Sequence, residues 1–391
     1  MAEEKKFISV LDYAKKLNKE FESETFLRKS DVIPGYKRLK SRALGMSYPL
    51  FGGLPYGRII VFSGKQHSGK TSAAWAAMGD YQKENPDRVC VFVDAEQSAD
   101  IEFQALMNDV DLSKLVIMQP EEGMSGEQVL ESVLELQLNT DDIGMIVVDS
   151  VPALVTAQNL KNEFTKDTGK QGTIAKSLHK FCGEILPSLH KKENILIFIN
   201  QVRVKDVMYN GAPIYSEPGG DALKFYSSIS VRFGTRSFMK GDTEISGENN
   251  GDGADGFRIK FQITKNKTAP CNRGGGFITY RYETGMDWMF DLLEIATTFD
   301  FIKRLNNVTY ALINLETGEM LKDEKGEDLK GKKKELIEYI NTHDKFRETY
   351  VQMLTDYISS KNTKKDSAEH LLSAEEEAEI RTEEGLVAKD E

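Results

Sequence analysis

Residues Gly64 to Thr71 carry the clearest chemical pattern in the sequence. They read Gly-Lys-Gln-His-Ser-Gly-Lys-Thr, which satisfies G-x-x-x-x-G-K-[ST], and they follow the apolar run Ile59 to Phe62. Glycines at these positions let backbone N–H groups and a helix N-terminus surround phosphate oxygens. Lys70 would then bridge the terminal phosphates, and the Thr71 hydroxyl would bind Mg²⁺. Unless the stretch is only a glycine-rich turn, the predicted nucleotide contacts are Gly64, Lys65, Gln66, His67, Ser68, Gly69, Lys70, Thr71 and Ser72.

Two acidic residues stand where other apolar runs end. Glu96 follows the run Val91 to Val93, and there it could orient the water that attacks a γ-phosphorus. Asp149 closes the run Ile146 to Val148, which is the form in which a carboxylate holds a nucleotide-bound metal. The alternatives are a surface acid for Glu96 and a helix-capping aspartate for Asp149. Beside a phosphate-binding loop, we expect both carboxylates to act on ATP and Mg²⁺.

A further apolar run, Ile195 to Asn200, delivers Gln201 to the same predicted edge, where its amide could sense a γ-phosphate. A loop with basic residues, aromatic residues and glycines follows, from residue 202 to 220. Such loops contact the backbone of single-stranded nucleic acid and stack on its bases. Another candidate loop, from 160 to 172, is rich in lysine and leads to a helix bearing Lys176. Either loop, taken alone, could instead be solvated surface.

These side chains need a scaffold that brings several strand ends to one edge. From about residue 45 to 300, apolar β-rich runs alternate with helical patterns, which is typical of a parallel sheet covered on both faces. Ligands bind at the carboxyl ends of the strands in such sheets. The last runs follow each other without long helices, so we expect an antiparallel extension, with residues 238–256 as a mobile hairpin or loop. The predicted strands are 59–63, 89–94, 115–118, 144–149, 195–200, 228–233, 257–264 and 277–282.

The two ends of the chain differ from this core. Residues 8–22 have apolar side chains at helical spacing. After about residue 300, a hairpin turn at 314–319 and helices at 330–340 and 345–360 indicate a small α+β domain. Beyond 361 the chain is charged and poorly apolar, so we expect disorder. From Asp366 onward, ten acidic and two basic residues contribute −8 of the net charge of −11, which leaves the body nearly neutral and able to form basic patches.

Composition limits the class of protein and its compartment. With 391 residues, 40% of them hydrophobic and 29% charged, the chain resembles soluble globular proteins of two or three domains. No apolar run approaches the ~20 residues of a membrane span, and Met1 to Lys6 lacks the apolar core of a secretory signal. Cys90, Cys182 and Cys271 form no close pair, so neither a zinc site nor a disulfide framework is indicated. We therefore expect a cytoplasmic protein without a membrane partner.

Six segments together resemble the RecA recombinases. In the family's order, they are Gly64 to Thr71, Val93 to Glu96, Val147 to Val151, Phe198 to Gln201, Gly219 to Tyr226 and Lys265 to Pro270. The resemblance covers roughly residues 50 to 300. It is looser at both ends, which suggests a phage-encoded relative of the UvsX type.

The resemblance implies a DNA-dependent ATPase that forms a helical filament on single-stranded DNA. Such a filament pairs with homologous double-stranded DNA and exchanges strands in recombination and repair, with single-strand-binding and mediator proteins as further partners. On the matching positions, Glu96 would activate water, Asp149 would hold Mg²⁺, and Gln201 would link the γ-phosphate to a DNA loop. Lys265 and Lys267 would reach into the ATP site of the next subunit.

Other matching positions are implied as ligand contacts. Asp100 and Phe103 match the family's adenine contacts, and Tyr282 resembles an aromatic residue beside the base or ribose. The first DNA loop matches poorly, and Asp206 and Asp221 bring negative charge near the expected DNA path. The DNA contacts that the resemblance carries over are Gln171, Gly172, Lys176, Arg203, Lys205, Gly219 and Gly220.

The implied fold is α/β, a RecA-like P-loop NTPase core with a central, mostly parallel twisted sheet. An N-terminal arm with a helix and a strand and a small C-terminal α+β domain would flank it. The expected parts are an oligomerisation arm at 1–44, the ATPase core with both DNA loops at 45–300, the small domain at 301–360 and an acidic tail at 361–391. Two alternatives stay open: a hexameric ring helicase with the same core, or a DNA-binding scaffold that ATP switches without a need for turnover.

Overall fold

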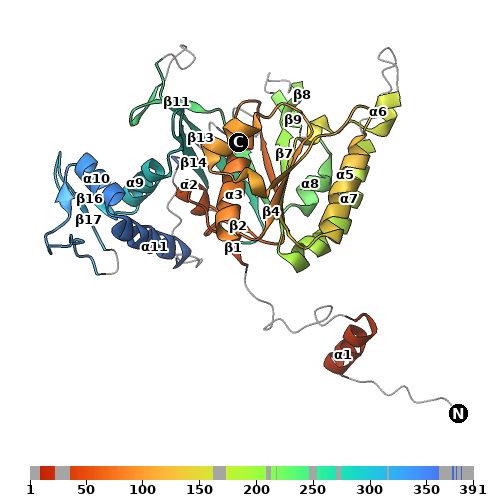
Figure 1. The fold of residues 1–391 in the computed structure, drawn as a ribbon, viewed down its shortest axis with the longest axis horizontal. Helices are drawn as coiled ribbons and strands as arrows, with labels where there is room; N and C mark the ends of the chain where they lie inside the picture. The colour runs from red at the N-terminus through yellow and green to blue at the C-terminus, as the bar shows by residue number, and fades with distance from the viewer. Residues whose placement is uncertain are drawn as a thin grey trace, which may run out of the picture. The chain divides into compact units, whose positions relative to one another are not determined.

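The structure is a computed structural model. It describes residues 9–22, 36–161, 173–207, 213–216, 218–245, 253–269, 274–314, 317–360, 372, 373, 376 and 380. The chain divides into two compact units, Met1–Lys37 and Arg38–Glu391 (Figure 1).

The first unit contains helix α1 (Val10–Glu20), which confirms the helix predicted over 8–22. Ser9 caps it, because the Ser9 hydroxyl accepts a hydrogen bond from the backbone N–H of Asp12 at 3.1 Å. No residue of α1 is buried, and Val10 is 85% exposed. The helix therefore has an apolar side that its own unit leaves open to solvent.

The second unit is built on a sheet whose central strands run parallel. Across the sheet they lie in the order β10, β3, β7, β6, β4, β5, and each neighbouring pair is parallel. These strands confirm six of the predicted ones. Strands β3 and β6 are buried throughout, as expected for the middle of a sheet covered on both faces, whereas the outer strand β5 has no buried residue. Their bounds are β3 (Ile59–Gly64), β4 (Val89–Asp94), β5 (Leu115–Met118), β6 (Ile143–Asp149), β7 (Ile195–Gln201) and β10 (Ile229–Phe233).

The predicted antiparallel extension is also present. Strand β13 (Gly256–Asn266) pairs antiparallel with β10, with β14 (Gly275–Arg281) and with β11 (Ser237–Lys240). Strand β12 (Thr243–Ile245) pairs with β11, so the start of the segment predicted as a hairpin or loop is a hairpin. Strand β15 (Gly285–Met286) pairs with β14.

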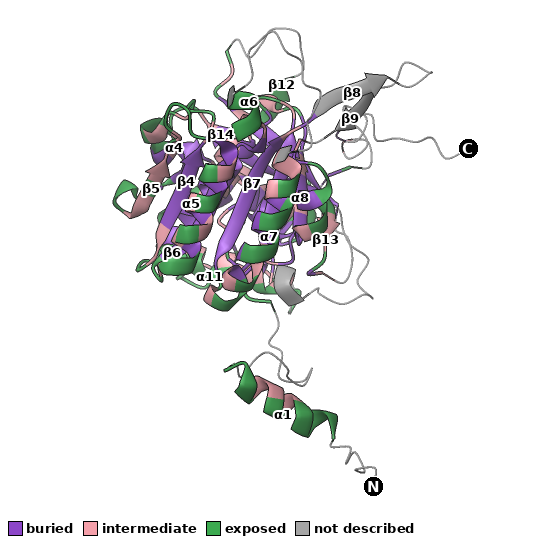
Figure 2. Ribbon diagram, turned by 90° about the vertical axis from the view of Figure 1, so that its right-hand side faces the viewer, coloured by how far each residue is buried: buried purple, intermediate pink, exposed green. Residues whose placement is uncertain are grey.

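Helices cover both faces of this sheet (Figures 1 and 2). Helices α3 (Lys70–Glu84) and α4 (Ile101–Asn108) bury apolar side chains against one face. Helices α5 (Gly126–Asn139), α7 (Thr173–Lys192) and α8 (Asp221–Tyr226) bury theirs against the other. In α7 the buried residues recur every three or four positions, and each buried aliphatic side chain stabilises the fold by about 1.5–3 kcal/mol. They are Leu178, Phe181, Cys182, Ile185 and Leu189.

The segment after the core forms the predicted α+β structure. Helix α9 (Trp288–Thr298) precedes a three-stranded antiparallel sheet of β16 (Ile302–Arg304), β17 (Tyr310–Leu312) and β18 (Lys330–Gly331). The turn predicted at 314–319 is closed by a hydrogen bond from Gly318 N–H to the Asn314 carbonyl at 2.7 Å. Helices α10 (Lys333–Thr342) and α11 (Asp344–Ser360) follow. Together with α2 (Leu44–Ser47), they share a third hydrophobic core.

Shorter elements complete the second unit. Strand β1 (Arg38–Leu39) pairs with β2 (Leu54–Pro55), and α6 (Ala157–Lys161) precedes α7. Single 3-10 turns lie at Leu112–Lys114 and Val151–Ala153. Among the helices that the structure describes, none is long and apolar enough to cross a membrane.

The structure corrects the expectation of a loop at 202–220. The stretch 202–220 contains paired strands β8 (Arg203–Val207) and β9 (Pro213–Ser216) instead of a plain loop. The sequence Asn210-Gly211 between them is a hairpin signal that outweighs the loop-like composition. Most of the tail, for which we expect disorder, lies outside the described residues; of its four described residues, Leu372 and Ile380 are buried.

Candidate active site

The loop between β3 and α3 has a backbone that needs glycine at Gly69. Its φ of 85° lies in the left-handed region, and a Cβ there would lie 2.3 Å from Cδ1 of Ile259. Lys70 is only 6% exposed, and its Nζ donates to the Lys65 carbonyl oxygen at 2.5 Å and to Ser68 Oγ at 3.2 Å. The cation thus lies inside the loop at the positive end of the α3 dipole, where phosphate oxygens could replace these acceptors.

Thr71 and Asp149 meet beside this loop. The Thr71 hydroxyl donates to Asp149 Oδ2 at 2.6 Å, so the start of α3 and the end of β6 place two oxygens together. Mg²⁺ is commonly held by one or two protein oxygens, with phosphates and waters as its remaining ligands. No group of three His, Cys, Asp or Glu ligands occurs within the described ranges, so a metal at this pair would depend on nucleotide oxygens. The pair fits a nucleotide-bound metal.

Asp149 lies in an environment that opposes its charge. Burial raises the pKa of this carboxyl to about 6, while the hydrogen bond from Thr71 and the Lys70 cation act in the opposite direction. The nearby Glu96 carboxylate raises the pKa further. A divalent cation between Asp149 and a phosphate would offset these costs.

Glu96 is held by the ends of two neighbouring strands. Its Oε1 accepts hydrogen bonds from the Ser150 hydroxyl and from Gln201 Nε2, the latter at 2.8 Å. Ser150 directly follows Asp149, and Gln201 is the last residue of β7. The sequence reasoning did not single out Ser150, although its place after the strand-ending aspartate was a usable signal. The predicted trio Glu96, Asp149 and Gln201 therefore does lie at one edge of the sheet.

The candidate DNA segment begins at this same edge. The N–H of Val202 donates to the carbonyl oxygen of Gly64 at 3.2 Å, which joins the start of β8 to the phosphate-binding loop. Asn200 Nδ2 donates to the Pro218 carbonyl oxygen at 2.9 Å, which ties the other end of the segment to β7. Both ends of the 202–220 stretch are thus attached to strands that carry active-site residues.

Gly219 and Gly220 bring this segment against the first turns of α7. A Cβ on Gly219 would lie 2.9 Å from Leu178 Cδ1, and one on Gly220 would lie 2.9 Å from Ala175 Cβ. Lys176 is exposed on the same turn of α7. Of the other predicted DNA contacts, Gln171 and Gly172 lie outside the described residues, as do the side chains of Arg203 and Lys205 in β8.

Lys265 and Lys267 lie away from the phosphate-binding loop of their own chain. Lys265 pairs with Ser230 of β10, and Ser230 pairs with Val61 of β3, three residues before Gly64. Lys267 is two residues further in the same direction, because β13 runs antiparallel to β10. With the usual rise per residue of a strand, the two lysines lie roughly 10 to 16 Å from Gly64 along the strand direction. They are displaced toward the end of the sheet at which the parallel strands begin, opposite to the edge with the phosphate-binding loop.

Both lysines contact the end of α8. Lys265 Nζ donates to the Lys224 carbonyl oxygen and to Ser227 Oγ, and Lys267 Nζ donates to the Phe225 carbonyl oxygen at 3.0 Å. Carbonyl groups at a helix C-terminus carry partial negative charge, which suits these cations. Burial and the neighbouring Lys267 lower the pKa of Lys265 to about 8.

The residues expected to contact adenine flank the active-site edge. Asp100 caps α4 by accepting a hydrogen bond from the N–H of Phe103 at 3.0 Å, and the Phe103 side chain is 48% exposed. Tyr282 directly follows β14, is 44% exposed and has its ring 6.0 Å from that of Phe257. Two exposed aromatic rings are therefore available for stacking on a base.

Comparison with known sequences identifies this architecture. A model of the RecA N-terminal domain matches residues 12–287. The chain belongs to the RecA family. Together with the mostly parallel sheet, this match confirms the predicted α/β RecA-like fold.

Three RecA-family relatives illustrate the similarity. Protein RecA of Streptococcus sanguinis (strain SK36) is 36% identical over 258 residues, which cover 65% of this chain and 62% of that protein. Protein RecA of Aquifex aeolicus (strain VF5) is 38% identical over 248 residues, 63% of this chain and 66% of that protein. Protein RecA of Mycoplasma mycoides subsp. mycoides SC is 31% identical over 325 residues, 83% of each chain. The aligned part thus spans less than two thirds of the Streptococcus relative.

Proposed function

We propose that this chain is an ATP-dependent recombinase. It would form a homo-oligomeric filament on single-stranded DNA, pair that strand with homologous double-stranded DNA and exchange strands, with DNA-stimulated hydrolysis of ATP to ADP and phosphate. The observation that carries the proposal is the 2.8 Å hydrogen bond between Gln201 and Glu96. It joins the carboxylate best placed to orient water to the residue where the candidate DNA segment begins. Binding of DNA near Gln201 can thereby move Glu96, and binding of ATP near Glu96 can move Gln201.

The hydrolytic chemistry follows from the positions of four side chains. Lys70 would exchange the Lys65 carbonyl for phosphate oxygens, because its cation already points into the loop. Thr71 and Asp149 would hold Mg²⁺, and this ion would neutralise negative charge on the phosphates. Glu96 would accept a hydrogen bond from the attacking water, with its carboxylate oriented by Ser150 and Gln201. Asp100, Phe103 and Tyr282 are the proposed contacts of the nucleoside.

We propose further that Lys265 and Lys267 complete the ATP site of a neighbouring subunit. Their place toward the edge opposite Gly64 supports this role, since they would have to act on another chain. A cationic residue supplied by a neighbour can raise the rate of phosphoryl transfer by ~10³ to 10⁵. The rate of ATP hydrolysis would then depend on the association of subunits and could serve as a measure of it.

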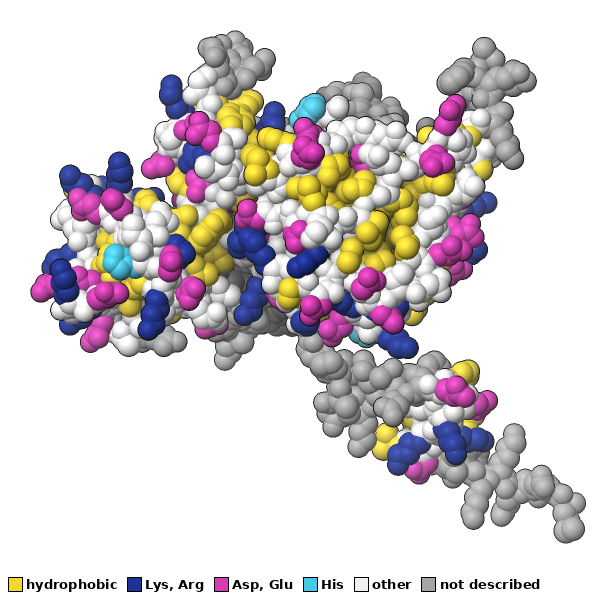
Figure 3. All heavy atoms as spheres, in the orientation of Figure 1, with side chains coloured by type: hydrophobic (Ala, Val, Ile, Leu, Met, Phe, Trp, Pro, Cys, Tyr) yellow, Lys and Arg dark blue, Asp and Glu magenta, His cyan; other side chains and the backbone are white. Residues whose placement is uncertain are grey.

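Exposed apolar surface supports assembly into a filament. On the second unit, Phe103 and Leu106 of α4 and Val116 of β5 are 48%, 76% and 48% exposed. Figure 3 shows hydrophobic side chains gathered on the face of the larger unit that is turned toward the viewer. Large exposed apolar patches mark sites of protein association. The apolar side of α1 is the complementary feature that we assign to a neighbouring subunit.

The proposed DNA contacts are Gln171, Gly172, Lys176, Arg203, Lys205, Gly219 and Gly220. Support comes from the convergence of the 202–220 stretch and the first turns of α7 at the active-site edge. If the basic residues neutralise phosphates, DNA affinity falls steeply with salt concentration.

The finer features of the proposal rest on sequence alone. We propose a division at 44/45, 300/301 and 360/361 into arm, core, small domain and tail, and a cytoplasmic site of action among DNA, single-strand-binding and mediator proteins. The looser resemblance at both ends supports a phage-encoded chain of the UvsX type, in which case the site of action is the host cytoplasm.

The proposal is tested by ATP hydrolysis with and without single-stranded DNA. We expect hydrolysis to rise on adding DNA, and we expect Lys70→Ala to abolish both hydrolysis and strand exchange because the phosphate cradle loses its cation. Lys83→Ala is the matched control, since Lys83 lies on α3 with its side chain 51% exposed, paired with Asp109. Equal hydrolysis with and without DNA would contradict the recombinase. A sixfold ring that unwinds DNA directionally would support the helicase instead.

A further inference from the structure

Tyr280 of β14 is a buried tyrosine whose hydroxyl lies between two helices. The residue is only 1% exposed, and its hydroxyl lies 3.0 Å from the Ser72 carbonyl oxygen and 2.9 Å from Asn108 Oδ1. Ser72 is in the first turn of α3, and Asn108 is the last residue of α4. Both partners are acceptors, so they share the one hydroxyl proton as a three-centre hydrogen bond. Burial raises the pKa of Tyr280, and the hydroxyl therefore keeps this proton.

The side chain of Asn108 is oriented to accept this hydrogen bond. Its Nδ2 donates to the Gln104 carbonyl oxygen at 2.9 Å and to Gln104 Oε1 at 3.3 Å, which leaves Oδ1 directed toward Tyr280. Asn108 is 1% exposed. A buried acceptor that loses its donor is costly, whereas replacing both partners by apolar groups can be nearly neutral. The pair can therefore be tested by changing one side chain and then both.

The last turn of α4 lies directly against α3. A Cβ on Gly79 of α3 would lie 2.2 Å from the Asn108 carbonyl oxygen, so the two backbones are in close contact. Arg42 donates from Nη2 to this same oxygen at 3.2 Å and from Nε to Asp80 of α3. The position of α4 is thus set where α3, Arg42 and the Tyr280 hydroxyl meet.

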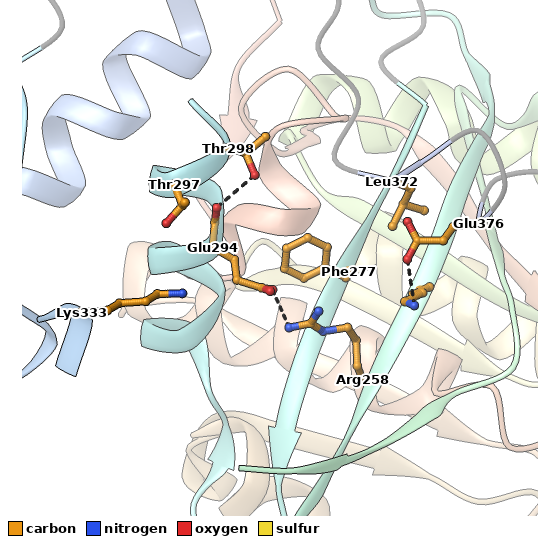
Figure 4. Close-up of a pocket in the computed structure, with 9 residues that line it drawn as sticks. Arg258, Phe277, Glu294, Thr297, Thr298, Lys333, Leu372 and Glu376 are labelled. Carbon is orange, nitrogen blue, oxygen red and sulfur yellow. Dashed lines mark hydrogen bonds and ion pairs between the residues drawn. The ribbon is translucent and has the colours of Figure 1, made fainter. Parts of the chain in front are cut away.

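Strand β14 gives Tyr280 a firm base. Side chains alternate between the two faces of a strand, so Thr279 faces away from Tyr280. Arg258 of β13 donates from Nε to Thr279 Oγ1 at 3.1 Å and forms an ion pair with Glu294 of α9. Figure 4 shows this ion pair beside a cavity of about 350 Å³ that Phe277 of β14 also lines. Contacts with α9 therefore anchor β14 on the face opposite to Tyr280.

A row of three aromatic rings connects Tyr280 to the exposed Tyr282. Phe257 of β13 pairs with Tyr280, and their rings are stacked with centroids 5.2 Å apart and 14° between the planes. The ring of Tyr282 lies 6.0 Å from that of Phe257. Tyr282 and Phe103 of α4 are the aromatic residues proposed to contact the nucleoside, and Ser72 belongs to the proposed phosphate contacts. The Tyr280 hydroxyl thus joins elements that carry both sets of contacts.

We propose that Tyr280 is a positioning residue of the nucleotide site: its hydroxyl fixes α4 against α3, so that one ATP contacts the phosphate-binding loop and the nucleoside residues together. This inference rests on the proposed nucleoside contacts Phe103 and Tyr282. The phosphate-binding loop itself follows β3 and packs on Ile259 beside Gly69, away from the hydroxyl. Tyr280 therefore contributes to the affinity for the nucleoside part of ATP and not to the affinity for the triphosphate.

The test compares two ligands in the full chain without DNA: ATP with Mg²⁺, and inorganic tripolyphosphate with Mg²⁺, which lacks the nucleoside. Tyr280→Phe removes only the hydroxyl. We expect this change to weaken ATP binding by about threefold to tenfold, the effect of one hydrogen bond, and tripolyphosphate binding by less than about twofold. Calorimetric titration measures both dissociation constants.

Tyr350→Phe is the matched control for loss of a buried hydroxyl. Tyr350 is also 1% exposed, and within the part of the chain that the structure describes its hydroxyl has no hydrogen-bond partner. It lies in α11, in the hydrophobic core of the C-terminal segment. Tyr350→Phe should bind both ligands as tightly as the wild type does.

A double variant separates positioning from stability. Tyr280→Phe leaves Asn108 Oδ1 without this donor, so we expect a lower unfolding temperature. Adding Asn108→Leu removes both polar groups and should restore most of that temperature. The preference for ATP over tripolyphosphate should stay reduced, because the link between the helices is still missing. Recovery of the wild-type preference together with the unfolding temperature would overturn the positioning role, as would an equal loss of affinity for both ligands in Tyr280→Phe.

The wild-type measurement distinguishes failure of this inference from failure of the proposed nucleoside contacts. A wild-type chain that binds ATP no more tightly than tripolyphosphate would contradict those contacts, and the positioning role with them. A wild type that prefers ATP, with an equal preference in Tyr280→Phe, would contradict the positioning role alone.

Discussion

At the scale of single residues, Asp291 of α9 is the strongest case of a carboxyl held in an unfavourable place. It is fully buried, and its Oδ2 accepts a hydrogen bond from the N–H of Thr279 at 2.9 Å. Within the described structure its Oδ1 has no hydrogen-bond partner. Burial raises the pKa of Asp291 to about 7, against which the hydrogen bond from Thr279 acts only partly.

This environment predicts a dependence of stability on pH. Asp291 keeps its proton in the folded chain up to about pH 7, whereas the ordinary pKa of an aspartate carboxyl is 3.8. The protonated Asp291 carboxyl therefore makes its full contribution to the free energy of unfolding below about pH 4. This contribution is lost as the pH rises through 7. Asp291→Asn should remove this loss and raise the free energy of unfolding at pH 8 by roughly 2 kcal/mol. Denaturant titrations at pH 5 and pH 8 measure it.

A matched change at the exposed Asp300 controls for the loss of a negative charge. Asp300→Asn should leave the difference in stability between pH 5 and pH 8 as it is in the wild type. An Asp291→Asn protein that lost stability equally at both pH values would contradict a protonated carboxyl at this position.

The sequence predicted residues whose chemistry is written in a short pattern. Lys70, Thr71, Asp149 and Glu96 lie where motif and strand end placed them, because each position depends on only a few neighbouring residues. Ser150 was missed because its partner Glu96 is 54 residues away along the chain. The burial of Asp291 likewise depends on how α9 packs on β14, which no local pattern records.

At the scale of elements, the phosphate-binding loop depends on the backbone of Gly69. Two glycines allow the cost of backbone strain to be distinguished from the cost of steric overlap. Gly69 and Gly123 have similar φ angles of 85° and 82°, but only at Gly69 would an added Cβ overlap with neighbouring atoms. Gly123→Ala should cost about 1–2 kcal/mol of stability from the left-handed backbone alone. Gly69→Ala should cost more and abolish nucleotide binding, because Ile259 must move. Thermal unfolding with and without ATP measures both effects.

The opposite ranking would contradict this account of the loop. If Gly69→Ala retained ATP-dependent stabilisation, the loop would not need the conformation that the structure shows. If Gly123→Ala were as damaging as Gly69→Ala, backbone strain alone would explain the loss.

Elements with a regular repeat were predictable, and elements that depend on a few residues were not. The buried parallel strands follow from continuous runs of apolar residues, as β6 illustrates. The long helices follow from apolar residues that recur every three or four positions, as α7 illustrates. The β8–β9 pair was missed because the basic and aromatic composition of the 202–220 stretch is typical of a loop that binds nucleic acid. The hairpin signal Asn210-Gly211 consists of only two residues within it. The burial of Leu372 and Ile380 was missed because both residues are isolated in a polar stretch, and their neighbours Gly275 and Gly234 are distant in sequence.

At the scale of the whole molecule, the residues of the proposed ATP site lie at two opposite ends of the parallel strands. Gly64, Asp149 and Glu96 share one edge of the sheet, while Lys265 and Lys267 lie toward the other and contact the end of α8. Head-to-tail association is the arrangement that brings opposite edges of identical chains together and can continue as a helix. We therefore propose that each ATP site is shared by two subunits.

Mixing two inactive variants tests this claim most directly. One variant is Lys265→Ala with Lys267→Ala, and the other is Glu96→Gln; neither alone should hydrolyse ATP on single-stranded DNA. In a filament of both at equal amounts, random neighbours restore about a quarter of the sites, because one chain supplies Glu96 and the other the lysines. We expect hydrolysis approaching that fraction of the wild-type rate. Hydrolysis no greater than the sum of the separate variants, in filaments shown by energy transfer between labelled chains to be mixed, would contradict it.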